Sequence, residues 1–191
     1  MTSNTLFSIF EKNSDAKKPA IIIPKSASVP TSITYQQLLD IIYDFSNKLS
    51  NLVPADFLAP GRSISISYPN SLEFVVSFLA STFMNLVASP LNPAYTEDEF
   101  NFYLEDAKSS VLILPRGSLD KKNNPAVLAA QKQKVFVVEI HWNGSELEMN
   151  AVVPPQFNQQ ARRKINGFIP KPDEPALLLH TSGTTGRPKG T

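Results

Sequence analysis

Apolar residues along the chain follow two different spacings, and the two kinds of segment alternate from about Ile21 onward. Spacings of three and four residues predict helices over 34–52, 70–85, 97–108 and 125–133. Short apolar runs predict strands over 20–24, 63–67, 86–91, 111–115 and 135–140. A strand-helix order that repeats in this way predicts an α/β fold, with a mostly parallel sheet and helices on both of its faces.

Capping signals mark where three of these helices begin. Two segments start with a capping box, in which a Ser or Thr is followed three residues later by Glu or Gln: Thr34–Gln37 and Thr96–Glu99. Asn70, with Glu73 at the third position, predicts the start of the helix over 70–85. That helix has little polar face, so we expect it to be deeply buried.

Composition is that of an ordinary globular protein. The 191 residues are 42% apolar and 18% charged, with a net charge of +1 and no cysteine. The small net charge gives no electrostatic reason to expect a nucleic-acid partner. The apolar runs are too short for a transmembrane segment, and the N-terminus does not resemble a secretory signal.

A change of composition precedes the segment that carries the chemistry. Proline and polar residues dominate 153–175, which predicts an irregular connection. The apolar run Ala176–His180 then predicts one more strand, and this strand leads directly into a glycine-rich segment.

The glycine-rich segment has the residue types of an anion-binding loop. Gly183 and Gly186 allow the backbone N–H groups to converge on an anion, because glycine reaches positive φ without steric cost. Lys189 adds a full positive charge. Hydroxyl donors come from three further residues of the loop: Ser182, Thr184 and Thr185. The segment therefore predicts a phosphate-binding loop.

Three alternatives stay open from the residues alone. The P-loop pattern G-x-x-x-x-G-K-[ST] of nucleotidases fails at Pro188 and Gly190, and the dinucleotide pattern G-x-G-x-x-G is absent. A flexible surface turn would use the same small residues. A non-catalytic interaction module that kept the loop as a scaffold is the third alternative.

The stretch Leu177–Thr191, which reads LLLHTSGTTGRPKGT, resembles the phosphate-binding loop of AMP-forming acyl-adenylating enzymes. These include the acyl-CoA synthetases, 4-coumarate-CoA ligases, firefly luciferases and peptide-synthetase adenylation domains. Residues 33–38, 65–80 and 89–114 also look like the N-terminal part of these enzymes. Residues 92–110 and His180 are most similar to the fungal and plant oxalate-CoA ligase branch, while His180 itself is expected to be a core-edge residue without a chemical part.

The resemblance implies an ATP-dependent acid-CoA ligase that uses ATP, Mg²⁺ and CoA on a small carboxylic acid, with oxalate as the first candidate. The substrate carboxylate attacks the α-phosphorus, pyrophosphate leaves, and the CoA thiol then displaces AMP. Carried over by motif, Lys189 would offset pyrophosphate charge, and the residues that wrap the β- and γ-phosphates would be Thr181, Ser182, Gly183, Thr184, Thr185 and Gly186. No catalytic residue and no metal ligand is assigned within the chain.

The resemblance also implies an extent and a location. Residues 1–191 correspond to the N-terminal portion of an AMP-binding domain, and the rest of that domain and its C-terminal lid domain are absent. We therefore expect the chain to be an inactive fragment when it is alone. The expected location is cytoplasmic or peroxisomal.

Overall fold

The central sheet has five strands, in the order β4-β3-β5-β6-β7, in the computed structural model, which describes residues 5–12, 17–24, 32–152, 172–181 and 189–190. The strands are β3 (Ser63–Ile66), β4 (Val87–Pro90), β5 (Ser109–Pro115), β6 (Phe136–Trp142) and β7 (Leu147–Val152). The first four of them run parallel, and β7 runs antiparallel to β6. The predicted mostly parallel sheet is confirmed.

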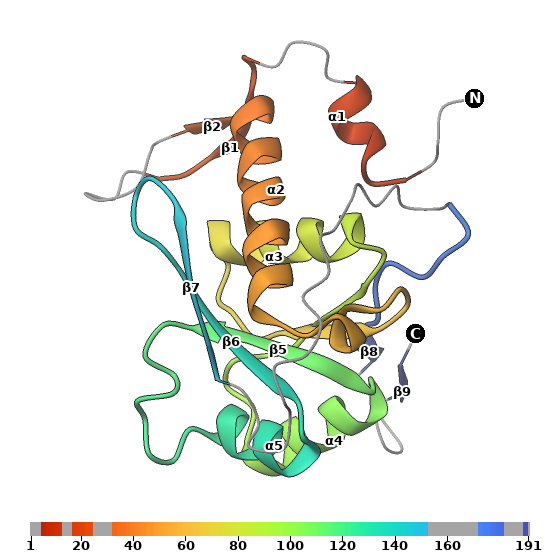
Figure 1. Ribbon diagram of the computed structural model, residues 1–191, viewed down its shortest axis with the longest axis vertical. Helices are drawn as coiled ribbons and strands as arrows, with labels where there is room; N and C mark the ends of the chain where they lie inside the picture. The colour runs from red at the N-terminus through yellow and green to blue at the C-terminus, as the bar shows by residue number, and fades with distance from the viewer. Residues whose placement is uncertain (1–4, 13–16, 25–31, 153–171, 182–188, 191) are drawn as a thin grey trace.

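Helices cover both faces of this sheet (Figure 1). Helices α2 (Tyr35–Leu52) and α3 (Leu72–Phe83) pack against each other on one face, and α4 (Glu97–Asp106) and α5 (Pro125–Gln133) pack against each other on the other face. This arrangement confirms the predicted α/β architecture. Within the described ranges, no helix is both long enough and apolar enough to cross a bilayer.

Smaller elements cover the N-terminal end of α2. Strands β1 (Pro19–Ile22) and β2 (Ser32–Thr34) form an antiparallel pair that leads directly into α2. Helix α1 (Ser8–Lys12) follows Phe7, whose ring lies 5.0 Å from the ring of Phe83 in α3. After α2, a single 3₁₀ turn (Ala55–Leu58) leads the chain into β3.

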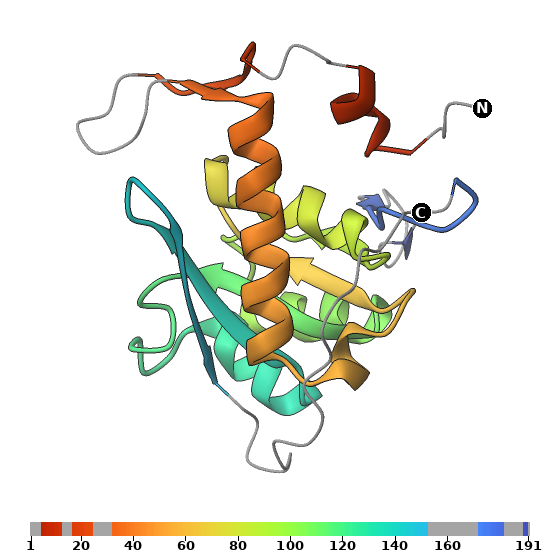
Figure 2. The same ribbon diagram turned by 45° about the horizontal axis from the view of Figure 1, so that its top comes forward.

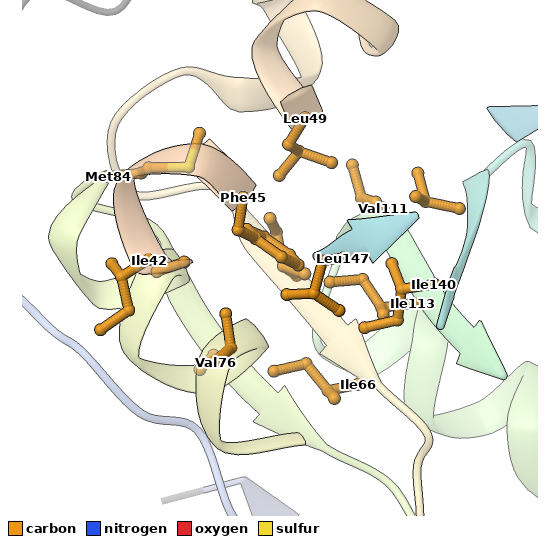
Figure 3. Close-up of a cluster of buried hydrophobic side chains, with 14 of the residues drawn as sticks. Ile42, Phe45, Leu49, Ile66, Val76, Met84, Val111, Ile113, Ile140 and Leu147 are labelled. Atoms are coloured by element: carbon orange, nitrogen blue, oxygen red, sulfur yellow. The ribbon is translucent and has the colours of Figure 1, made fainter. Parts of the chain in front are cut away.

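The larger part of the core lies between the sheet and helices α2 and α3 (Figure 3). Phe45 of α2 is fully buried and points toward the sheet, where Ile66, Val111 and Leu147 lie. Each fully buried side chain of this kind contributes about 1.5–3 kcal/mol. A second cluster, which includes Phe100, fills the space between the sheet and helices α4 and α5.

Both predicted capping boxes are confirmed. The Thr34 hydroxyl accepts from the backbone N–H of Gln37, while the Gln37 side chain accepts from the Thr34 N–H. Thr96 and Glu99 form the same reciprocal pair at the start of α4. Helix α5 occupies 125–133 as predicted, and the side chain of Asn124 accepts from the first free N–H groups of this helix.

The predicted start of α3 is wrong by one residue. Ser71, not Asn70, is the N-cap, because Ser71 has the extended backbone of a cap and its hydroxyl accepts from the N–H of Phe74 at 3.3 Å. Glu73 therefore takes no part in a capping box. Its carboxylate instead accepts a hydrogen bond from the backbone N–H of Trp142 at 3.0 Å, and this bond ties α3 to the end of β6.

The expected deep burial of α3 holds for one of its faces. Val76 and Ala80 have no exposed surface. Phe74 and Phe78 are half-buried and only border the core. Helix α3 lies beside α2 on the same face of the sheet (Figure 2), and its two half-buried phenylalanines keep part of their apolar surface accessible.

Strand β7 was not predicted. It pairs with β6 as a hairpin, with Trp142 opposite Leu147 and Ile140 opposite Met149. The turn between these strands contains Asn143 and Gly144. The side chain of Asn143 accepts from the N–H groups of the two residues after Gly144, and Gly144 has a φ of +105°, which favours glycine.

Candidate nucleotide-phosphate site

The two ends of the predicted phosphate-binding loop lie side by side. Strands β8 (His180–Thr181) and β9 (Lys189–Gly190) pair antiparallel, with Thr181 opposite Lys189 and His180 opposite Gly190. The backbone of Thr181 and that of Lys189, the first and last residues assigned to the loop, are thereby brought together. Residues 182–188, which include Ser182, Gly183, Thr184, Thr185 and Gly186, lie outside the described residues.

The predicted strand over 176–180 is only partly formed. A single parallel bridge joins Leu177 to Ala88 of β4, where Ala88 donates to the carbonyl oxygen of Ala176 at 3.0 Å and accepts from the N–H of Leu178 at 2.9 Å. The segment therefore extends the sheet at its β4 edge for about one residue. The chain then forms β8, because His180 and Thr181 pair with β9 instead of with β4.

His180 joins the start of the loop to helix α4. Its side chain is only 4% exposed, and Nε2 lies 2.9 Å from Oδ2 of Asp106, the last residue of α4. A carboxylate only accepts hydrogen bonds, so Nε2 carries the hydrogen atom and donates a hydrogen bond to Asp106. The other ring nitrogen, Nδ1, is buried and has no hydrogen-bond partner in the part of the chain that the structure describes.

Two tyrosines form the aromatic wall next to His180. The ring of Tyr103 lies 4.7 Å from the ring of His180 at an interplanar angle of 67°, and Tyr103 is also stacked at 4.7 Å on Tyr95, which lies just before the N-cap of α4. Burial, and then a hydrogen bond with Tyr103, raises the pKa of Tyr95 to about 12. Tyr103 therefore packs directly against the imidazole, and Tyr95 supports Tyr103 from its other side.

The sequence did not reveal the partners of His180. The expectation that His180 lies at the edge of the core agrees with its burial. Asp106, however, is 74 residues away along the chain, at the last position of its helix. No local spacing signal connects these two residues, so only the tertiary structure identifies the pair.

A separate hollow of about 480 Å³ lies at the carboxyl ends of β3 and β5. Its lining includes Ser67, Pro115, Ser118, Lys121 and Asn124. The β3/β5 boundary is the point where the strand order reverses, which is a common place for ligands in open α/β sheets. Asp106 precedes the first residue of β5, so the His180 contact and this hollow lie toward opposite ends of that strand.

The described residues provide no protein site for a metal ion. No group of three or more His, Cys, Asp or Glu side chains in the described ranges is placed to hold one. Within these ranges, the side chains therefore form no metal site by themselves.

Comparison with known proteins places the chain in a family. The family model described as AMP-binding enzyme matches residues 10–191. An oxalate-CoA ligase of Arabidopsis thaliana is 36% identical over 100% of this chain and 35% of its own length, and one of Saccharomyces cerevisiae is 32% identical over 89% of this chain and 34% of its own. The chain thus spans about a third of the length of these relatives.

Solved structures show the same fold. MatB from Rhodopseudomonas palustris, in its apo form, superposes with a TM-score of 0.68 at 24% identity, over 100% of this chain and 34% of that chain. The O-succinylbenzoate-CoA synthetase MenE from Bacillus subtilis, in complex with AMP, gives a TM-score of 0.64 at 20% identity, over 95% of this chain and 40% of that chain. The fold and the resemblance expected from the sequence are both confirmed: this chain belongs to the AMP-binding enzyme family.

Proposed function

We propose that this chain provides the ATP-phosphate-binding part of an AMP-forming acid-CoA ligase. The observation that supports the proposal most strongly is the antiparallel pairing of Thr181 with Lys189, because it brings the two ends of the glycine-rich motif side by side. Glycine-rich segments between such ends are a common way to bind an anion through backbone N–H groups. The match of the AMP-binding family model to residues 10–191, which include this motif, is the second support.

In the proposed reaction, a carboxylate oxygen of the acid attacks the α-phosphorus of ATP, and the bond from that phosphorus to the bridging oxygen of pyrophosphate breaks. The CoA thiol then attacks the acyl carbon, loses its proton and displaces AMP, which leaves a thioester. The residues of this chain take no covalent part. They bind the β- and γ-phosphates through 181–186 and, with the charge of Lys189, favour the negative charge that develops on pyrophosphate.

The substrate acid that we propose first is oxalate. Two relatives that carry the name oxalate-CoA ligase are 36% and 32% identical to this chain, and these identities extend over most of it. Medium-chain and aromatic acids are the next candidates. A cytoplasmic or peroxisomal location remains a prediction that microscopy of a tagged chain would test.

The two alternative functions are less well supported. A P-loop nucleotidase needs a hydroxyl residue directly after the lysine, and Gly190 stands there. A non-catalytic module would keep the fold without binding ATP. The experiment below distinguishes it from the ligase by the presence or absence of ATP turnover.

The test uses a chimera in which residues 1–191 replace the matching N-terminal third of the Arabidopsis relative. We expect the chimera to catalyse ATP–pyrophosphate exchange with an acid and to release AMP when CoA is added. A panel of oxalate, malonate, succinate, a medium-chain acid and an aromatic acid then ranks the substrates. A folded chimera that gives no exchange with any acid, while the parent relative does so in parallel, would refute the proposal.

A second measurement uses the 191-residue chain alone. We expect no exchange above the blank, since the chain corresponds to about a third of the length of the relatives whose activity the proposal invokes. Turnover by the chain alone would show that its residues already form a complete site. That result would overturn the proposal that this chain provides only the phosphate-binding part of the site.

A further inference from the structure

The contact between His180 and Asp106 joins two distant parts of the chain. Asp106 is the last residue of α4, and His180, 74 positions later, directly precedes the phosphate-binding loop. His180 is also the first residue of β8, so the position of its backbone determines where the hairpin of β8 and β9 begins.

The imidazole of His180 is held on two sides. Asp106 accepts a hydrogen bond from Nε2–H at 2.9 Å, and the Tyr103 ring lies against the imidazole at 4.7 Å. The hydrogen bond is directional, so it selects the tautomer with the proton on Nε2 and one orientation of the ring. Since only 4% of the side chain is exposed, rotating it away would remove a packed ring from the edge of α4.

We propose that His180 and Asp106 are a positioning pair for the phosphate-binding loop. The pair fixes β8 against the C-terminal end of α4, and the pairing of His180 with Gly190 and of Thr181 with Lys189 carries that position to both ends of the loop. This inference rests on the proposed function of the loop. Neither residue touches the reacting atoms, so the pair acts on ATP binding through the backbone.

Because Asp106 is the last residue of α4, its replacement tests the pair without weakening the helix. A negative charge at the C-terminus of a helix is unfavourable for the helix dipole, so its removal alone would slightly stabilise α4. Any loss in Asp106→Ala therefore comes from the pair and not from the helix. Glu105, which is exposed in the same turn, gives the matched control Glu105→Ala with the same change of charge.

The first experiment measures the pair by NMR in the 191-residue chain. The chain has two histidines, so the ring signals of His180 are resolved against those of His141 as an internal reference. We expect the tautomer with the proton on Nε2 for His180 in the wild type and its loss in Asp106→Ala. The backbone amide signals of Thr181 and Gly190 shift in that variant and stay unchanged in Glu105→Ala.

The second experiment measures ATP kinetics in the chimera. We expect Asp106→Ala and His180→Phe each to raise the KM for ATP by about tenfold, with kcat and the KM for the acid nearly unchanged. The phenyl ring of His180→Phe keeps the contact with Tyr103 but has no proton to donate. Asp106→Asn keeps an acceptor oxygen and restores most of the ATP affinity, which a loss of folding stability alone would not predict.

The outcomes separate the two proposals. Amide signals of Thr181 and Gly190 that do not move in Asp106→Ala would overturn the positioning pair, and so would an unchanged KM for ATP in both variants. A wild-type chimera without ATP turnover would overturn the proposed function, while the NMR result still decides whether the pair holds β8 on α4.

Discussion

The Glu73 carboxylate accepts a 3.0 Å hydrogen bond from the backbone N–H of Trp142, 69 residues away along the chain. Glu73 lies in the first turn of α3, where the helix dipole favours a negative charge, and Trp142 is the last residue of β6. One side chain thus joins the helix layer to the strand that begins the unpredicted hairpin.

Replacement of Glu73 by alanine is expected to lower the free energy of unfolding by about 2 kcal/mol, because a hydrogen bond to a charged group is lost and an N–H is left without an acceptor. Urea unfolding followed by the fluorescence of Trp142, the single tryptophan, measures the change. Glu73→Gln keeps an acceptor and should lose less, and Glu105→Ala is the surface control. Equal stability of the wild type and Glu73→Ala would contradict the role of this bond.

Because of Tyr68, the free energy of unfolding is expected to fall at alkaline pH. Its hydroxyl donates to the carbonyl oxygen of Ile140 at 2.6 Å, and burial raises the pKa of this phenol well above its usual value of 10.0. Above about pH 10 the unfolded chain loses this proton and the folded chain keeps it, so the free energy of unfolding falls as pH rises.

Denaturant unfolding between pH 9 and pH 11, on the order of one unit on either side of the ordinary tyrosine pKa, measures this slope. Tyr68→Phe should flatten the alkaline slope, although it lowers stability at neutral pH by about 1 kcal/mol through loss of the hydrogen bond. Tyr43→Phe, at a side chain that is 48% exposed, is the control. If Tyr68→Phe and Tyr43→Phe have the same slope, the buried phenol is not its source.

The capping box of α4 predicts that loss of the Thr96 hydroxyl lowers the stability of the fold. Its hydroxyl accepts from the N–H of Glu99, so Thr96→Ala is expected to cost about 1 kcal/mol of stability. Thr96→Ser retains the hydroxyl and should remain close to the wild type. Thermal unfolding of the three proteins checks this order, and an alanine variant as stable as the serine variant would exclude the cap as a stabilising contact.

Phe45 predicts the largest loss of stability among single changes in α2. Its side chain is fully buried between α2 and the sheet, and truncation to alanine leaves a cavity (Figure 3). We expect Phe45→Ala to lower the free energy of unfolding by about 3–5 kcal/mol. Leu52→Ala, on the same helix at a residue that is 39% exposed, should change it far less. Similar losses for the two would mean that Phe45 is not in the core.

Local signals were sufficient for much of the fold. Spacing and capping residues predicted helix α2 with its Thr34 cap, and α5 over 125–133, because the interactions that start a helix lie within four residues. The parallel order followed from the alternation of strands and helices. At α3, Asn70 and Ser71 are adjacent and both residue types can serve as a cap. The structure uses Ser71, and the Glu73 carboxylate bonds to the N–H of Trp142.

Strand β7 has a local signal in the sequence. Asn143 and Gly144 form a typical hairpin dipeptide between apolar segments, and Leu147, Met149 and Ala151 alternate with polar residues. The pairing of His180 with Asp106 had no such signal. A contact between residues 74 positions apart depends on how α4 and β8 pack, and that packing is absent from any local pattern.

The measurement that tests the central claim most directly is ATP–pyrophosphate exchange by the chimera with Lys189→Met. The account predicts a loss of about 10²-fold, because the charge that favours pyrophosphate is removed from the loop. Lys132→Met, at a lysine of α5 that is 61% exposed and paired with Glu97, should retain the parent rate. An unchanged exchange rate in Lys189→Met would contradict the assignment of this loop to the phosphates of ATP.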